Sequence, residues 1–360
     1  MADKKDIRKL SLDQLTKEIV DMGEKAFRAK QIYEWIWKKR AISFSHMTNL
    51  SENLRAKLSK EYEFHAIKLS DSQVSNDRTI KNAFALFDNA IIEGVLIPTP
   101  KRMTACVSVQ VGCSLSCAFC ATGKLKRVRN LNHDEIYDQV VMINSQAKEK
   151  YNIPLSNIVF MGMGEPLLNY KSLIESIEKI TSEKGLGMSP KRITVSTAGI
   201  ANKIKRLADD GVRFNLALSL HAANDEKRNK IMPINESNNL EVLKEALRYF
   251  YQKTKTKLTF EYIIFKDFND EIQDAVELVE FCKSIPSKVN IIEYNAIDDG
   301  QYQQADPEKV DAFAAYLESK NIIVNIRRSR GKDIDAACGQ LANKNEAIKK
   351  EDVFYKKELS

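Results

Sequence analysis

The sequence predicts an α/β protein: a partial (β/α)6-type barrel preceded by a small helical domain and a short β region. Strand-like and helix-like segments alternate from residue 104 onward, which indicates parallel strands joined by right-handed helical crossovers. Before about residue 62, hydrophobic residues recur at helical spacing instead. The 360 residues, of which 43% are hydrophobic, suffice for one large domain and a smaller one.

Residues 1–65 are predicted to form a helical accessory domain. We expect helices after Ser11, which has the spacing of a capping box with Gln14, and over 29–39 and 50–61. Trp35 and Trp37 are expected in the domain core, although such side chains can also stack on bases. A compact basic helical module of this kind suits RNA binding.

Residues 66–100 are predicted to form a β-hairpin linker. Two strand-like runs, 83–87 and 90–97, are joined by Asp88-Asn89, a turn sequence. Glu93 interrupts the second apolar run. By itself it indicates either a solvent-facing residue or a paired residue on a half-buried strand.

The barrel is predicted over residues 101–345, followed by a charged tail at 346–360. Expected strands are 104–110, 157–161, 192–197, 214–221, 258–264, 288–294 and 322–328. Expected helices are 133–148, 171–183, 200–210, 239–254, 271–284 and 307–319, the first capped by Asn132 with Glu135. Small and polar residues share one face of the first and fourth strands, which predicts an interior with room for a ligand.

Charge and composition limit the function classes. The net charge of +7 is compatible with nucleic acid as a partner. No hydrophobic signal segment follows Met1, and no run approaches the length of a membrane span, so we expect a cytoplasmic protein without a membrane partner. Reducing conditions in that compartment favour metal or redox roles for the cysteines over a structural disulfide framework.

Cys113, Cys117 and Cys120 have the spacing C-x3-C-x2-C. Only a wrapped loop can aim three thiols at this spacing toward one site, and thiolates suit an iron–sulfur cluster or zinc. Both kinds of structural site use four protein ligands, so three cysteines leave one cluster iron open. Three buried structural cysteines are the alternative, but this spacing would rarely arise by chance in a chain with six cysteines.

Further candidates lie at the predicted carboxyl ends of strands, where barrels of this kind carry chemistry. They are Gly164 and Glu165, Ser196, Ser219-Leu220-His221 and Asn295. Each is a weak signal alone, since a single His or Asn is more often structural. Small residues flank Cys338 and keep its sulfur approachable, although most single cysteines are inert, as we expect for Cys282.

The cysteine spacing resembles the signature of the radical S-adenosylmethionine (radical SAM) superfamily. Cys106, the Gly-Met-Gly-Glu-Pro sequence ending at Pro166, the Ser219-Leu220-His221 triplet and the segment Asp333–Leu341 together resemble the RlmN/Cfr family of RNA methyltransferases. Residues 163–169 resemble its adenine-C2 branch. One departure is Glu293-Tyr294-Asn295-Ala296, where many members have Pro-Trp-Asn-Pro.

This resemblance implies a partial barrel of the radical SAM type, a 4Fe–4S cluster on Cys113, Cys117 and Cys120, and SAM as cosubstrate. It implies that SAM is bound by Gly164, Glu165, Ser196, Ser219, Leu220, His221 and Asn295. It also implies two SAM molecules per methylation: one methylates Cys338, and the other yields a radical that activates this methyl group for addition to carbon 2. Cys106 would then release the product and form a Cys106–Cys338 disulfide, while Glu93 or Cys106 removes the ring proton.

The implied substrates are an adenosine at the peptidyl transferase centre of 23S rRNA and the adenosine beside the anticodon in tRNA. The implied electron donor is external, such as flavodoxin or ferredoxin. The basic runs 124–129 and 327–332 would grip phosphates or form a solvated face. Two rival hypotheses are a radical SAM enzyme for a small molecule, which would not use Cys338, and a zinc-stabilised RNA-binding protein without catalysis.

Overall fold

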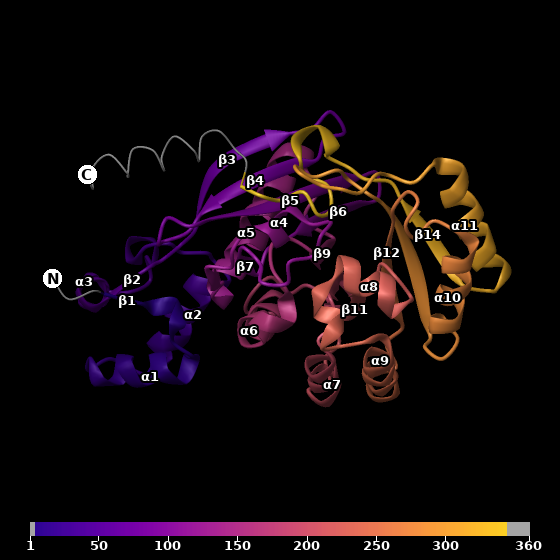
Figure 1. Ribbon diagram of the computed structural model, residues 1–360. Coiled ribbons are helices and arrows are strands. Elements are labelled where there is room, and N and C mark those ends of the chain that lie inside the picture. Colours follow the sequence, from indigo (N-terminus) through magenta and orange to yellow (C-terminus); the bar gives the residue numbers. More distant parts are fainter. Residues whose placement is uncertain (1–3, 344–360) are drawn as a thin grey trace.

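The computed structural model describes residues 4–343, so the predicted tail at 346–360 lies outside the described residues (Figure 1). A sheet of ten strands runs through the molecule in the order β14-β13-β12-β11-β10-β9-β6-β5-β4-β3. Its parallel part comprises β6 (Arg102–Cys106), β9 (Asn157–Phe160), β10 (Ile193–Thr197), β11 (Asn215–Ser219), β12 (Leu258–Ile264), β13 (Ser287–Glu293) and β14 (Ile323–Arg327). The fold is thus the predicted partial barrel of α/β type.

Helices connect the parallel strands and follow one another along the curved sheet (Figure 1). They are α5 (His133–Tyr151), α6 (Tyr170–Thr181), α7 (Ala201–Asp209), α9 (Leu240–Thr254), α10 (Ile272–Cys282) and α11 (Pro307–Ser319). The predicted cap of α5 is present, because the Glu135 side chain accepts the backbone N–H of Asn132. Two short helices, α4 (Ala121–Lys124) and α8 (Asp225–Ile231), were not predicted.

The segment predicted as a hairpin linker extends the barrel sheet itself. It forms β3 (Lys68–Val74), β4 (Ile80–Ala85) and β5 (Ile91–Thr99), all antiparallel to their neighbours. The Asp88-Asn89 turn is present, with Asn89 in the left-handed conformation that asparagine tolerates. β3 was not predicted because its residues are polar and partly exposed at the sheet edge. β5 pairs with β6 and places Val95 opposite Cys106.

The N-terminal domain contains α1 (Leu12–Asp21), α2 (Phe27–Trp37) and α3 (Glu52–Glu61). Ser11 and Gln14 form the predicted capping box. Trp37 is buried and Trp35 is half-buried with its indole N–H bonded to Asn49, as expected for core residues. The unpredicted two-residue strands β1 (Lys5–Asp6) and β2 (Tyr62–Glu63) pair in parallel, so the chain enters and leaves the domain side by side.

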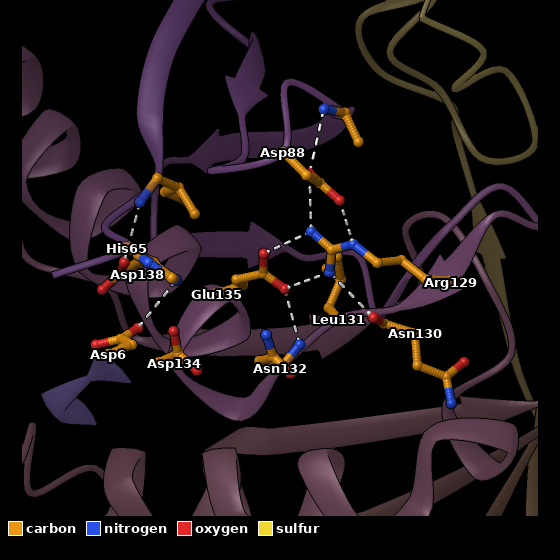
Figure 2. A network of polar contacts seen from close by, with 12 residues as sticks. Asp6, His65, Asp88, Arg129, Asn130, Leu131, Asn132, Asp134, Glu135 and Asp138 are labelled. Carbon is orange, nitrogen blue, oxygen red and sulfur yellow. Dashed lines mark hydrogen bonds and ion pairs between the residues drawn. The ribbon is translucent and has the colours of Figure 1, made fainter. Parts of the chain in front are cut away.

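Buried ion pairs join the N-terminal domain to α5. Arg8 lies 2.7 Å from Asp138, 3.0 Å from Asp134 and 3.5 Å from Asp6. Nearby, Arg129 lies between Asp88 and Glu135, which Figure 2 shows together with the three aspartates. Within residues 4–343, no helix is long and apolar enough to cross a membrane.

Candidate active site

One cavity opens at the carboxyl ends of the parallel strands. Its empty space, including the open solvent at its mouth, is about 850 Å³. Nine of the predicted site residues line it: Cys113, Cys117, Cys120, Gly164, Glu165, Ser196, Ser219, His221 and Cys338. Leu115, Phe119, Phe160, Met161, Met232, Ile263 and Ile292 add an apolar lining that the sequence did not single out.

The cysteine loop (residues 112–120) follows β7 (Gln110–Val111) and ends at α4. Gly112 begins it with a φ of +73°, and a Cβ there would lie 2.3 Å from the carbonyl oxygen of Lys126. Ser116 also has a positive φ, at the tight turn between the thiols of Cys113 and Cys117. Burial raises the pKa of all three thiols.

The three cysteines of this loop line one cavity, and the charges of Cys113 and Cys120 act on Cys117. No group of three or more His, Cys, Asp or Glu side chains in residues 4–343 could hold a single metal ion. In a 4Fe–4S cluster each cysteine binds a different iron, so the sulfurs need not converge on one point. Here they border one cavity that has room for a further ligand.

Glu165 lies in the segment between β9 and α6, and it is buried. Its carboxylate accepts hydrogen bonds from the backbone of Leu167 (2.9 Å), the hydroxyl of Thr197 (2.7 Å) and the backbone of Ala198 (2.8 Å). These bonds favour the charged form, but burial has the larger effect and raises the pKa of Glu165. A cationic ligand in the cavity would offset the energetic cost of burying the charged Glu165 carboxylate.

His221 follows β11 and has a left-handed backbone, with a φ of +56°. Its Nδ1 accepts the backbone N–H of Ile263 at 3.1 Å. Burial lowers the pKa of His221 to about 3, so the ring is neutral at pH 7 and carries its proton on Nε2. The ring of Phe119 meets it edge-on at 4.7 Å. His221 therefore offers the cavity one N–H donor and not a positive charge.

Other predicted cofactor residues divide between the cavity and its surroundings. The hydroxyl oxygens of Ser196 and Ser219 lie 3.3 Å apart on the cavity wall. The Leu220 side chain packs in the hydrophobic core instead. Asn295 donates to the carbonyl oxygen of Cys338 at 3.3 Å, while its own Oδ1 has no hydrogen-bond partner in residues 4–343. Asn295 thus contacts the chain around Cys338 and does not line the cavity.

Cys106 and Cys338 lie close enough for their charges to interact. Burial raises the pKa of Cys106 to about 12, and a thiolate at Cys338 raises it further. Burial also raises the pKa of Cys338, while Arg327 opposes this rise. All six cysteines are free thiols in the structure, so it contains no Cys106–Cys338 disulfide.

The C-terminal loop (residues 328–343) holds Cys338 against the cysteine loop. The carbonyl oxygen of Gly339 accepts the backbone N–H of Ala121 at 2.7 Å, and that of Leu341 accepts the Thr122 hydroxyl at 2.6 Å. A Cβ on Gly339, which has a φ of +85°, would lie 3.2 Å from the carbonyl oxygen of Phe119. Close backbone contact therefore fixes the sulfur of Cys338 at the edge of the cavity.

Glu93 lies outside the cavity lining, on β5. Its Oε2 accepts the backbone N–H groups of Ala342 (2.8 Å) and Asn343 (3.1 Å). Its Oε1 lies 3.8 Å from Lys81 and accepts no hydrogen bond from residues 4–343. Burial raises the pKa of Glu93. Glu93 is thus a fully buried, paired residue that anchors the end of the C-terminal loop.

Several charged residues around the site could not be found from the sequence. Arg228 on α8 is fully buried beneath the strand ends, although its neighbours in the sequence are charged and suggest an exposed helix. Glu261 on β12 lines the cavity and pairs with Arg327 at 3.3 Å. No motif marks these residues, because their roles depend on contacts between distant elements.

Some side chains of the two basic runs form ion pairs within the protein. Arg129 pairs with Asp88 and Glu135, and Arg328 pairs with Glu293 at 2.6 Å. Lys126 and Arg127 remain exposed beside the cysteine loop. Part of each basic run thus has a structural role, and only the remaining side chains are available to bind phosphates.

Two known protein families match this chain, one over the N-terminal domain and the other over part of the barrel. A family described as "Ribosomal RNA large subunit methyltransferase N-terminal domain" matches residues 5–64. The family described as "Radical SAM superfamily" matches residues 107–279.

Relatives match almost the whole chain. A probable dual-specificity RNA methyltransferase RlmN of Flavobacterium psychrophilum is 58% identical over 95% of this chain and 99% of its own length. The dual-specificity RNA methyltransferase RlmN of Nautilia profundicola is 40% identical over 94% of this chain and 98% of its own. The crystal structure of a radical SAM methyltransferase from Sphaerobacter thermophilus superposes with a TM-score of 0.88 at 36% identity, covering 94% of this chain and 99% of that one.

Proposed function

Because this chain belongs to the RlmN family of radical SAM RNA methyltransferases, we propose that it methylates carbon 2 of adenosine in two RNAs. These are 23S rRNA, at the peptidyl transferase centre, and tRNA, at the adenosine next to the anticodon. The chain is an RNA methyltransferase with SAM and a 4Fe–4S cluster as cofactors. With these RNA substrates, the protein would act in the cytoplasm.

The position of Cys338 is the observation that carries this proposal. Cys338 lines the same cavity as the three cysteines of the cysteine loop, and its charge interacts with that of Cys106. A radical enzyme for a small molecule would need neither additional thiol. A zinc-stabilised RNA-binding protein would need no cavity beside its metal ligands. Two extra thiols at this place support a reaction that passes through a protein-bound methyl group.

Residues of the cavity match the groups of SAM by their chemistry. Cys113, Cys117 and Cys120 would hold a 4Fe–4S cluster, which would supply the electron for cleavage of SAM. Glu165 suits the ammonium group, since a cation would stabilise its buried carboxylate. Ser196, Ser219 and the Nε2–H of His221 offer hydrogen bonds to polar groups. Gly164 lines the cavity with a φ of +95°, and a Cβ there would lie 2.5 Å from the side chain of Gln110, so the position favours glycine.

Carbon 2 of adenine explains the need for Cys338. This carbon is electrophilic and cannot attack the methyl group of SAM, whereas a cysteine thiolate can. Cys338 therefore takes the methyl group first, at the cost of one SAM, and presents it to the base. Activation of that methyl group consumes a second SAM. The target base must leave its stack to reach the cavity.

Release of the product needs a second thiol and a base. Attack of Cys106 on the sulfur of Cys338 would free the methylated base and leave a transient disulfide between them. The radical adduct would also give up one proton and one electron, the electron returning to the oxidised cluster, and an external reductant would then open the disulfide. Cys106 and Glu93 are the two candidates for the base. The Oε1 of Glu93 accepts no hydrogen bond from residues 4–343, and this, together with the raised pKa of the carboxyl group, supports Glu93 as a proton acceptor. An electron donor such as flavodoxin or ferredoxin would serve the cluster.

Mass spectrometry of RNA tests the proposed activity. We expect 2-methyladenosine in both 23S rRNA and tRNA from cells that carry the gene, and its loss from both when the gene is deleted. Deletion that leaves both levels unchanged would contradict the function. Loss from one RNA alone would remove the second substrate from the proposal.

Cysteine variants test whether the methyl group passes through Cys338. Cys338→Ala removes the methyl acceptor and should abolish methylation. Cys106→Ala should instead accumulate a covalent complex between protein and RNA, visible on a denaturing gel, because the product cannot be released. Cys282→Ala is the matched control, since Cys282 is buried in α10 away from the cavity and should be dispensable. Methylation by Cys338→Ala would exclude the protein-bound methyl group.

A further inference from the structure

We propose that Arg228 is the buried counter-charge of the cluster on the cysteine loop and raises its reduction potential. This inference rests on the assignment of Cys113, Cys117 and Cys120 as cluster ligands. It concerns a residue of the unpredicted helix α8, which lies under the ends of β10 and β11. Four observations support it: the burial of Arg228, its hydrogen bonds, the absence of an ion pair with a carboxylate of residues 4–343, and the attachment of α8 to the cysteine loop.

Arg228 is the largest fully buried side chain of the described residues. Moving a guanidinium out of water is costly unless an anion and hydrogen bonds compensate for the lost hydration. The hydrogen bonds are present. Nε donates to the carbonyl oxygen of Leu220 (3.1 Å), Nη1 to the side chain of Asn235 (2.6 Å), and Nη2 to the carbonyl oxygens of Ala198 (2.6 Å) and Ser219 (3.3 Å).

All four acceptors are neutral, so the charge of Arg228 is not balanced by them. No carboxylate in residues 4–343 forms an ion pair with it, whereas the similarly buried Arg8 has three. Asp225 forms no ion pair with Arg228, although its charge acts on the guanidinium, and its carboxylate accepts a hydrogen bond from the amide of Asn235 at 2.8 Å. A buried arginine with this environment requires another negative group nearby.

The cysteine loop provides that group. The last residue of α8, Ile231, accepts the backbone N–H of Ala118 at 3.0 Å, so the helix is fixed directly against the loop. Cys117 packs against the hydrophobic cluster that contains Ala198 and Ile231, and the carbonyl oxygen of the same Ala198 accepts Nη2 of Arg228 at 2.6 Å. Thiolates and the reduced cluster are anionic, and a buried guanidinium interacts strongly with them because the surroundings have a low dielectric constant.

Reduction of the cluster adds one negative charge beside Arg228. A fixed positive charge stabilises the reduced state more than the oxidised state, and thereby raises the potential. Charge, burial and hydrogen bonds to sulfur are general means by which a protein tunes such clusters. Arg228 also holds the carbonyl groups at the ends of β10 and β11, so an experiment must separate its charge from this structural role.

Potentiometric titration of the reconstituted holoenzyme, followed by electron paramagnetic resonance of the reduced cluster, makes that separation. Arg228→Met removes the charge and should lower the midpoint potential, whereas Arg228→Lys keeps the charge and should stay near the wild type. Asp225→Asn removes the opposing charge and should shift the potential upward. We expect the Arg228→Met shift to correspond to a roughly tenfold change in the one-electron equilibrium, about 59 mV.

Lys227→Met is the matched control. It removes a positive charge from the neighbouring position of α8, where Lys227 pairs with Asp274 instead, and it should leave the potential near that of the wild type. Iron and sulfide content is measured for each protein. If Arg228→Met does not retain the cluster, Arg228→Lys and Asp225→Asn decide the question.

Two results would overturn the proposal. One is an unchanged potential in Arg228→Met with full iron content. The other is a downward or absent shift in Asp225→Asn, because a purely structural disturbance has no reason to reverse sign with charge. A wild-type protein that binds no 4Fe–4S cluster would instead contradict the assignment of the cysteine loop itself.

Discussion

His221 shows how burial sets the chemistry of a single residue at this site. The spacing of Ser219-Leu220-His221 predicted its position at a strand end, but not its protonation state. That state follows from the Ile263 N–H, which occupies Nδ1, and from burial, which makes the charged ring unfavourable. His221 is thus suited to donate one hydrogen bond and unsuited to act as a base at neutral pH.

The lowered pKa of His221 also predicts how stability depends on pH. An ordinary histidine binds a proton near pH 6.5, whereas folded His221 does so near pH 3. Between these values the unfolded chain binds a proton that the folded chain does not, so folding stability is lost as the pH falls. One such proton changes the free energy of unfolding by up to about 1.4 kcal/mol per pH unit.

His221→Gln should remove this loss. We expect the stability of the wild type relative to the variant to decrease as the pH falls from 7 to 4, measured by denaturant unfolding at each pH. Burial also lowers the pKa of His133, to about 4, but His133 is present in both proteins and cancels in the comparison. A difference in stability that is constant over this range would contradict the assignment of a neutral, buried ring.

At the scale of elements, the β3–β5 extension of the sheet holds the C-terminal loop at both ends. Asp333 accepts the hydroxyl of Ser75 at 2.5 Å and the backbone N–H of Asn76 at 3.0 Å, in the turn between β3 and β4. At the other end, Glu93 on β5 accepts two backbone N–H groups. Cys338 lies between these attachments. The extension therefore serves to place a thiol as well as to continue the sheet.

Asp333→Asn should loosen the first attachment without touching the cavity. Because an amide cannot accept both hydrogen bonds as a carboxylate does, Cys338 would be less well placed when SAM is cleaved. We expect several-fold more 5′-deoxyadenosine per methylated adenosine, measured by chromatography of single reactions. Asp209→Asn is the control, since exposed Asp209 also accepts a hydroxyl, that of Tyr249. Equal ratios in the two variants would show that this attachment does not position the thiol.

The same elements show how far the sequence predicts the structure. β12 and α11 match their predicted ranges to the residue, because a continuous apolar strand and a proline-started helix are strong local signals. β3 and α8 were missed, because their residues are polar or charged and their partners are far away in the chain. Nine of the residues predicted from motifs and strand ends line one cavity, whereas the positions of Arg228 and Glu261 depend on tertiary contacts alone.

At the scale of the whole molecule, one buried arginine joins the N-terminal domain to the barrel. The sequence predicted the domain but not its attachment, because Arg8, Asp134 and Asp138 are far apart in the chain. Burial raises the pKa of Asp134 to about 7, and Arg8 opposes this rise. Arg8, a residue of the other domain, therefore limits how far burial raises the pKa of Asp134 and Asp138.

Arg8→Met should leave these carboxylates buried without a partner. Loss of one member of such a group costs about 3–5 kcal/mol of stability, and we expect a loss of that size in denaturant unfolding at pH 8. The loss should be smaller at pH 5. A carboxyl group whose folded pKa is raised contributes stability below its ordinary pKa and loses that stability as the pH rises through the folded value. Protonation at pH 5 therefore removes the unpaired buried charge from the variant.

Arg206→Met is the control. It breaks an exposed ion pair on α7 and should change the free energy of unfolding by less than about 0.5 kcal/mol. An Arg8→Met loss that is equal at both pH values would mean that packing, and not charge, holds the two parts together.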